Sequence, residues 1–294
     1  MTLTDLELDL KNLGINKGDN LFITMDISSV GYFAGSKSQT LKNWQDILEK
    51  LVGDEGSFTL AAYTNGYLRF NLKRSNRKIF SRFRKTYAGS FSNYLIKQKD
   101  YLRSTHPTNS VIGYGKNLKN IYLRHNENSK SYSVLGDIAE LPQSKFIMIG
   151  TVDKKNAPQS MHYAQEVLGI TNKHPLRGLF AMDYIDQNGT HQKFVRKDIG
   201  GCSAGGYKLL GYLMLEGIVF SNKVGNAFSI IMPAKKAIDQ TLKVLSIDKC
   251  IIKCDDKYCL DCNGSYQYNG LKIILFYMKM FPSLLSKAYR KLKC

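Results

Sequence analysis

A histidine stands one loop beyond a short apolar run that is typical of a buried strand. The run is Phe146–Ile149, and His162 lies at the start of a helix that the pattern predicts to begin near Gln159. Functional groups of α/β domains collect at the carboxyl ends of strands, so this position suits a catalytic side chain. An imidazole titrates near neutral pH and can take a proton from a nucleophile. The local sequence leaves a second interpretation open, in which the ring only packs against or caps the helix.

A second candidate site is the connection between a predicted strand, Leu21–Met25, and a predicted helix, Leu41–Leu51. Small hydroxyl residues and glycine between a strand and a helix present backbone N–H groups to an anion. Many such loops share this composition, so the pattern is weak by itself. The connecting residues are Asp26, Ile27, Ser28, Ser29, Val30 and Gly31.

A third group of polar side chains precedes Pro107. Arg103, Ser104 and His106 offer a charge, a hydroxyl and an imidazole. Pro107 disfavours the helical conformation at His106, which places the group on an irregular segment. Further upstream, residues 73–85 hold seven basic side chains among thirteen. This basic segment is either a solvated face or a wall that gathers phosphate.

Four cysteines lie close together near the C-terminus, and they are Cys250, Cys254, Cys259 and Cys262. Four thiolates can hold zinc, but most zinc sites use two pairs separated by a longer loop. Plain reduced cysteines are therefore the preferred interpretation, and the sequence predicts no metal site.

Apolar periodicity predicts alternating helices and strands, and hence an α/β domain. Asn188-Gly189 between two β-rich runs predicts a hairpin. We expect one α/β domain at residues 1–246 and a Cys-rich segment with a basic amphipathic helix at residues 247–294. Further predicted helices and strands lie at 4–13, 57–63, 90–99, 111–114, 118–123, 207–217, 227–231 and 234–245.

The chain is strongly basic, with 42 Lys and Arg against 24 Asp and Glu and a formal charge of +18 over 294 residues. This excess favours anionic partners and disfavours a polycationic one. The acidic N-terminus lacks a signal-peptide pattern and no apolar run is long enough to span a bilayer, so we expect a cytoplasmic protein. Residues 271–294 could place it peripherally at the inner membrane face, or dock on the core.

Four short segments, in their order along residues 4–245, resemble the aminoglycoside 3-N-acetyltransferase family. They are Leu13–Asp19 with Ile27–Gly31, Leu102–Pro107 with Ser110 and Gly115, Ile147–Gly150 with Ser160–His162, and Lys223–Ala227. The resemblance implies a central, mostly parallel sheet flanked by helices, and transfer of an acetyl group from acetyl-CoA to an amino sugar. It implies that His162 is the catalytic histidine. It also implies that the coenzyme channel is lined by Ser28, Ser29, Val30, Gly31, Arg103 and Ser104, with His106 beside them.

The chain departs from the family pattern at several polar positions. A carboxylate usually orients a catalytic histidine. The family's acid three residues after the histidine is Gln165 here, and Glu166 stands on the same helix face as His162, so we predict Glu166 as the partner. Other departures are Thr24–Asp26, Asn93, Ile96 and the neutral Gly-rich loop Gly200–Gly206.

These departures fall on polar and acidic groups that would hold a polycationic drug. Together with the basic charge, they favour an anionic acceptor, such as a nucleotide- or lipid-linked amino sugar of surface polysaccharide synthesis. Aminoglycoside acetylation and resistance is the alternative with the same chemistry. A non-catalytic relative that binds CoA or a glycan is a third hypothesis. Nucleic acid ranks last among the partners, because no recognised nucleic-acid motif accompanies the basic residues.

Overall fold

The computed structural model describes residues 1–69, 79–173, 178–186, 188–196, 201–267, 275–276, 278–279 and 281–282. Its main sheet has seven strands in the order β10-β11-β7-β1-β2-β6-β5. These strands are β1 (Asn20–Met25), β2 (Ser57–Ala61), β5 (Leu102–Arg103), β6 (Val111–Tyr114), β7 (Ser144–Ile149), β10 (Phe220–Val224) and β11 (Ala227–Pro233). A smaller, four-stranded sheet contains β3 (Tyr67–Leu68), β4 (Ile79–Phe80), β8 (Phe180–Ile185) and β9 (His191–Val195).

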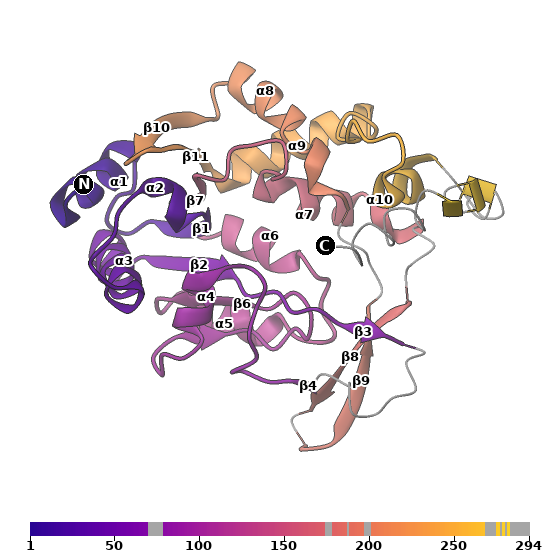
Figure 1. Cartoon of the computed structure of the whole chain (residues 1–294), viewed down its shortest axis with the longest axis horizontal. Coiled ribbons are helices and arrows are strands. Elements are labelled where there is room, and N and C mark those ends of the chain that lie inside the picture. Colours follow the sequence, from indigo (N-terminus) through magenta and orange to yellow (C-terminus); the bar gives the residue numbers. More distant parts are fainter. Residues whose placement is uncertain are drawn as a thin grey trace.

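Helices cover both faces of the main sheet (Figure 1). The helices of the described residues are α1 (Leu3–Leu13), α2 (Ile27–Val30), α3 (Lys37–Val52), α4 (Ser90–Leu95), α5 (Leu118–Arg124), α6 (Ser133–Ala139), α7 (Gln159–Val167), α8 (Lys208–Leu215), α9 (Ala234–Ile247) and, away from the main sheet, α10 (Leu260–Cys262). None of the helices in the described ranges has the length and apolar character that crossing a bilayer requires.

The predicted α/β class is confirmed, but the sheet is mixed. Only β7, β1 and β2 run parallel, and the outer strands pair antiparallel with their neighbours. Because the carboxyl ends of parallel strands meet at one edge, the loops after β7, β1 and β2 converge there.

Alternate residues of the central strands belong to different cores. Leu21 and Ile23 of β1 pack into a cluster with α1 and α3, whereas Phe22 joins a second cluster with α5, α6 and α9. This alternation follows from the two-residue period of a strand. Burial on both faces explains why β1 and β7 read as nearly continuous apolar runs.

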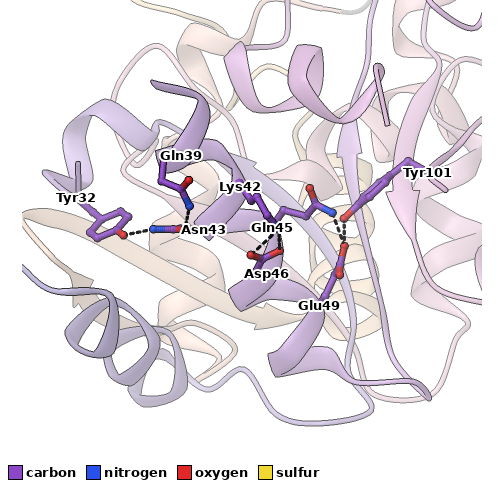
Figure 2. Close-up of polar contacts among 8 residues, drawn as sticks. All are labelled: Tyr32, Gln39, Lys42, Asn43, Gln45, Asp46, Glu49 and Tyr101. Atoms are coloured by element: carbon purple, nitrogen blue, oxygen red, sulfur yellow. Dashed lines mark hydrogen bonds and ion pairs between the residues drawn. The ribbon is translucent and has the colours of Figure 1, made fainter. Parts of the chain in front are cut away.

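Polar contacts fix the outer side of α3 (Figure 2). Glu49 accepts hydrogen bonds from Gln45 Nε2 at 2.9 Å and from the Tyr101 hydroxyl at 2.5 Å. Tyr101 directly precedes β5, so its contact with Glu49 ties α3 to the far edge of the main sheet. Burial and this carboxylate both raise the pKa of Tyr101, so the hydroxyl stays protonated and donates.

Several elements escaped prediction because they carry little apolar pattern. The edge strand β10 exposes three of its residues, Phe220, Ser221 and Lys223, and shows no inward-facing run.

The hairpin at Asn188-Gly189 is confirmed, since β8 and β9 pair antiparallel from Ala181 with Val195 to Ile185 with His191. This hairpin belongs to the smaller sheet, which extends from the main body at the lower right of Figure 1.

The described part of the C-terminal segment packs on α7 and α9. Ile252 and Tyr266 belong with Met161 and Leu245 to a third apolar cluster. The division of the chain at residue 246 stays a prediction. Most of the basic helix predicted at residues 271–294, and residues 73–78 of the basic segment, lie outside the described residues.

Candidate active site

A cavity of about 650 Å³ opens at the carboxyl edge of the parallel strands. The ends of β1 and β2, the start of α4 and the start of α7 form its walls. Its described lining includes Thr24, Asp26, Ser28, Tyr63, Tyr87, Phe91, Tyr132, Gln159, His162, Arg196, Gly201 and Ser203. The position of the cavity agrees with the expectation that functional groups gather beyond these strands.

The loop between β7 and α7 brings His162 to this cavity. At the first residue of α7, Gln159 is buried, and its Nε2 donates to the Ile147 carbonyl oxygen at 2.8 Å. This bond ties the helix start to strand β7. Gly150, with φ +64°, begins the loop, and a Cβ atom there would lie 1.9 Å from the Ser29 hydroxyl oxygen. Only glycine therefore lets the α2 turn approach β7 this closely.

Both ring nitrogens of His162 have defined partners. Nδ1 lies 2.9 Å from Gln165 Oε1, and Nε2 lies 3.0 Å from Ser203 Oγ. The Nε2 atom of Gln165 donates to the Tyr266 hydroxyl at 2.6 Å, which leaves the amide oxygen to accept from Nδ1–H. The unprotonated nitrogen is therefore Nε2, and it receives the Ser203 O–H. Tyr132 stacks on the ring with centroids 5.1 Å apart.

Burial lowers the pKa of His162 below its usual 6.5, and the positive charge of Arg196 acts in the same direction. The bond to Gln165 opposes this shift but does not reverse it. The ring is consequently neutral near pH 7, with Nε2 free of a proton. A neutral imidazole of this tautomer is a general base facing a cavity.

Gln165, and not Glu166, contacts the histidine ring. Both Glu166 carboxylate oxygens face the backbone N–H of Tyr132, at 3.0 and 3.3 Å. Glu166 thus holds the residue that stacks on His162, instead of bonding to Nδ1 as the sequence predicted. Residues three and four positions after His162 both lie on its face of the helix, and tertiary contacts determine which of them bonds to the ring.

Of the predicted coenzyme residues in the 28–31 loop, Ser28 lines the cavity. Its backbone N–H and hydroxyl both donate to Asp26 Oδ1, at 3.0 and 2.5 Å, which caps α2. Ser29, Val30 and Gly31 are absent from the described lining. Their role in binding the coenzyme stays a prediction.

Arg103, Ser104 and His106 are absent from the cavity lining that the structure describes, and each has other partners. Arg103 donates to the carbonyl oxygens of Ala62, Arg82 and Arg84 at 2.6–2.8 Å. Ser104 and His106 are 1% and 0% exposed, and Ser104 Oγ lies 2.9 Å from His125 Nδ1. His106 stacks on His125, with centroids 4.9 Å apart. These contacts hold the strand edge together, and a direct coenzyme contact of the three residues stays a prediction.

A second cavity, of about 520 Å³, shares Tyr87 with the first. Arg84 and Lys85 of the predicted basic segment line it. Lys85 is exposed, so its ammonium group is accessible to a ligand. An exposed lysine fits both a solvated face and a phosphate-gathering wall, so the role of the segment stays a prediction.

Ser203, Tyr266 and Arg196 reach the site although sequence reasoning assigned them no role. Ser203 belongs to the Gly-rich loop Gly200–Gly206, which the sequence singled out only as a neutral departure from the family pattern. Nothing local signals Tyr266, which approaches Gln165 from a segment 101 residues further along the chain. The group of four cysteines that the sequence singled out differs in one member. Cys254, Cys259 and Cys262 gather with Cys202, and Cys250 is exposed outside the group.

Comparisons with known proteins identify the family and the fold of the chain. The chain matches the model of the aminoglycoside 3-N-acetyltransferase family over residues 22–246. No curated protein matches it. The aminoglycoside acetyltransferase AAC(3)-IVa apoenzyme is similar in structure, with TM-score 0.71, 17% identity, and coverage of 90% of this chain and 96% of that chain.

Two further structures are similar at comparable identity. AAC-IIIb, solved as a binary complex with CoASH, has TM-score 0.67 and 18% identity over 84% of this chain and 97% of that chain. AAC-VIa bound to sisomicin has TM-score 0.66 and 18% identity over 84% of this chain and 98% of that chain. At identities this low, the structural similarity establishes the shared fold alone. The family match, however, covers most of the sequence. The chain therefore belongs to the aminoglycoside 3-N-acetyltransferase family and is an acetyltransferase with acetyl-CoA as its co-substrate.

Proposed function

We propose that this enzyme acetylates an amine of an aminoglycoside-type amino sugar, with Nε2 of His162 as general base. The observation that carries the proposal is the orientation of His162. Its Nδ1–H is committed to Gln165, its basic Nε2 accepts from the Ser203 hydroxyl, and both His162 and Ser203 line a cavity of about 650 Å³. That volume is within the range of small-molecule sites.

The residues of the cavity would act on the proton of the acceptor amine. Acetyl-CoA supplies an acetyl thioester. The acceptor nitrogen bonds to the thioester carbon, the C–S bond breaks, and the sulfur leaves with its electron pair. Nε2 of His162 takes the proton released from nitrogen and returns it to the departing sulfur. General base catalysis of this kind contributes roughly 10²- to 10⁴-fold to a rate.

The coenzyme phosphates are assigned to the second cavity. Arg84 and Lys85 provide positive charge there, and Tyr87 lines both this cavity and the one that holds His162. A co-substrate that occupies both cavities would have its anionic end beside Arg84 and Lys85. The residues present therefore fit acetyl-CoA.

The charges of the described cavity lining do not favour an anionic acceptor. Asp26 is the only carboxylate, and Arg196 the only lysine or arginine, among the described residues that line it. The overall charge of +18 is thus not concentrated where the acceptor would bind. The preference for a nucleotide- or lipid-linked sugar of polysaccharide synthesis finds no support in the comparisons, whereas the structurally similar AAC-VIa is bound to sisomicin.

Acetyl-CoA with a panel of acceptors tests the proposal. Release of CoA thiol is followed with aminoglycosides and with nucleotide-linked amino sugars, and products are identified by mass. We expect turnover of at least one aminoglycoside, and a loss of about 10²-fold or more in His162→Ala. His191→Ala is the matched control, because His191 is exposed on β9. Turnover of nucleotide-linked sugars alone would reject the acceptor, and an unchanged rate in His162→Ala would reject the base.

A further inference from the structure

Four thiols from two distant segments meet beside the candidate active site. Cys202 precedes a short turn at Ser203–Gly205, and Cys254, Cys259 and Cys262 follow α9. Their Sγ atoms all lie within 4.8 Å of one another. All four are free cysteines, so no disulfide accounts for the convergence.

The spacing and the donor type match a tetrahedral metal site. Zinc–sulfur bonds of about 2.3 Å place tetrahedral ligands about 3.8 Å apart. Cys254 Sγ and Cys262 Sγ lie 3.6 Å apart, close to that value. Four thiolates exclude calcium and magnesium, which prefer oxygen, and a tetrahedral set of four sulfurs is typical of zinc or iron.

Contacts around the thiols hold the two segments together. A Cβ atom on Gly205 would lie 2.0 Å from the Ile252 carbonyl oxygen, so only glycine permits this approach. Lys208 donates to the Lys253 carbonyl oxygen at 2.6 Å and forms an ion pair with Asp255 at 2.9 Å. The backbone N–H of Cys254 points at Cys262 Sγ at 3.4 Å, as N–H groups do around bound thiolates.

We propose that Cys202, Cys254, Cys259 and Cys262 bind one zinc ion that anchors both segments to the active site. With four protein ligands the ion has no open position, so its role is structural. Cys250, which the sequence included in the group, is exposed and takes no part.

Two residues close in sequence to the proposed zinc ligands take part in the hydrogen bonds around His162. Ser203, bonded to His162 Nε2, is the neighbour of Cys202. Tyr266, bonded to Gln165, follows Cys262 by four residues on the same short helical stretch. A Cβ atom on Gly201, on the other side of Cys202, would lie 2.6 Å from Gln165 Nε2. The ion thus positions residues that set the tautomer of His162, and this part of the inference rests on the proposed function.

Metal content of the full chain tests zinc binding without any reference to acetyl transfer. Protein purified without chelator is analysed for zinc and iron by mass spectrometry. We expect about one zinc per chain in the wild type and in Cys250→Ser, the matched control. Cys202→Ser and Cys254→Ser should lose at least tenfold in retained zinc after dialysis against a chelator. Iron instead of zinc would overturn the choice of ion, and neither metal would overturn the site.

A second measurement does not depend on how the variants fold. Wild-type protein is titrated with a mercurial thiol reagent in the presence of a zinc-sensitive dye. Release of about one zinc per chain, complete only as the fourth of the clustered thiols reacts, supports the site. Cobalt-loaded protein should show thiolate-to-cobalt charge-transfer absorption. Its absence, or its persistence unchanged in Cys202→Ser, contradicts the ligand set.

The positioning role has its own readout. Wild type stripped of zinc should lose about tenfold in kcat, and its pH profile should change because Ser203 and Tyr266 are no longer held; zinc should restore both. Unchanged kcat and pH profile after removal would leave a zinc site without a positioning role. If His162→Ala retains activity while zinc is present at one per chain, the proposed base fails and the metal site stands.

Discussion

Oε1 of Gln165 lies 2.9 Å from Nδ1 of His162, so a neutral amide orients the candidate base. A carboxylate at this place would stabilise the charged imidazolium, which an amide does only weakly. The hydrogen bond to the amide raises the pKa of His162 less than burial lowers it, so the net shift is downward. The enzyme therefore combines a fixed tautomer with a ring that stays neutral to lower pH than an exposed histidine.

Gln165→Glu should move the acidic limb of the pH profile of kcat/KM to higher pH. The new carboxylate favours the protonated ring and raises the pKa of His162, so more acid-side activity is lost. Gln165→Ala should instead lower kcat by about tenfold, less than loss of the base itself. An acidic limb that does not move in Gln165→Glu would show that His162 does not titrate in the rate-determining step.

Asp26→Asn should raise KM for polycationic acceptors about two- to fivefold, the range of an exposed ion pair. Asp26 is the only carboxylate in the described lining, so the effect should fall with added salt and be weak for a monoamine sugar. Asp46→Asn, on the exposed side of α3, is the control. Equal effects of the two substitutions would contradict a role for Asp26 in acceptor binding.

Lys85→Ala should raise KM for acetyl-CoA about two- to fivefold and leave KM for the acceptor unchanged. The reason is the loss of one exposed positive charge beside the second cavity. Steady-state kinetics with each substrate varied in turn separates the two constants. Lys116→Ala, also exposed and paired with Glu55, serves as the comparison. A rise in acceptor KM alone would place the coenzyme elsewhere.

Stability should fall in mild acid because buried histidines resist protonation. Burial lowers the pKa of His125 from 6.5 to about 4 and places the pKa of His106 well below 6.5. The unfolded chain therefore binds more protons between about pH 6.5 and pH 4, and stability decreases as pH falls through that window. His125 alone contributes about 3 kcal/mol to this loss.

Urea denaturation at several pH values measures this effect. His125→Gln should lower stability at neutral pH, since Ser104 and Ser131 lose a partner, and should flatten the acid dependence. His191→Gln should leave the pH dependence unchanged, because His191 is exposed. Wild-type stability that does not change from pH 7 to pH 4 would contradict the buried, neutral state of His125.

The sequence by itself determined the parts that depend on local pattern. Continuous apolar runs identified β1 and β7, because both faces of these strands are buried. Asn188-Gly189 identified the hairpin, and ordered short motifs identified the family and placed His162 one loop beyond a strand. Each of these signals lies within a few residues of the feature that it predicts.

Tertiary structure decided the rest, because side chains distant in sequence compete for the same partner. Gln165 and Glu166 are equally placed by helix spacing, and contacts with Tyr132 and Tyr266 directed one to the ring and the other away from it. The sequence singled out four neighbouring cysteines. In the structure Cys202, from another loop, takes the place of exposed Cys250 in the group. Which side chains come into contact depends on how segments pack, and a local sequence pattern does not predict it.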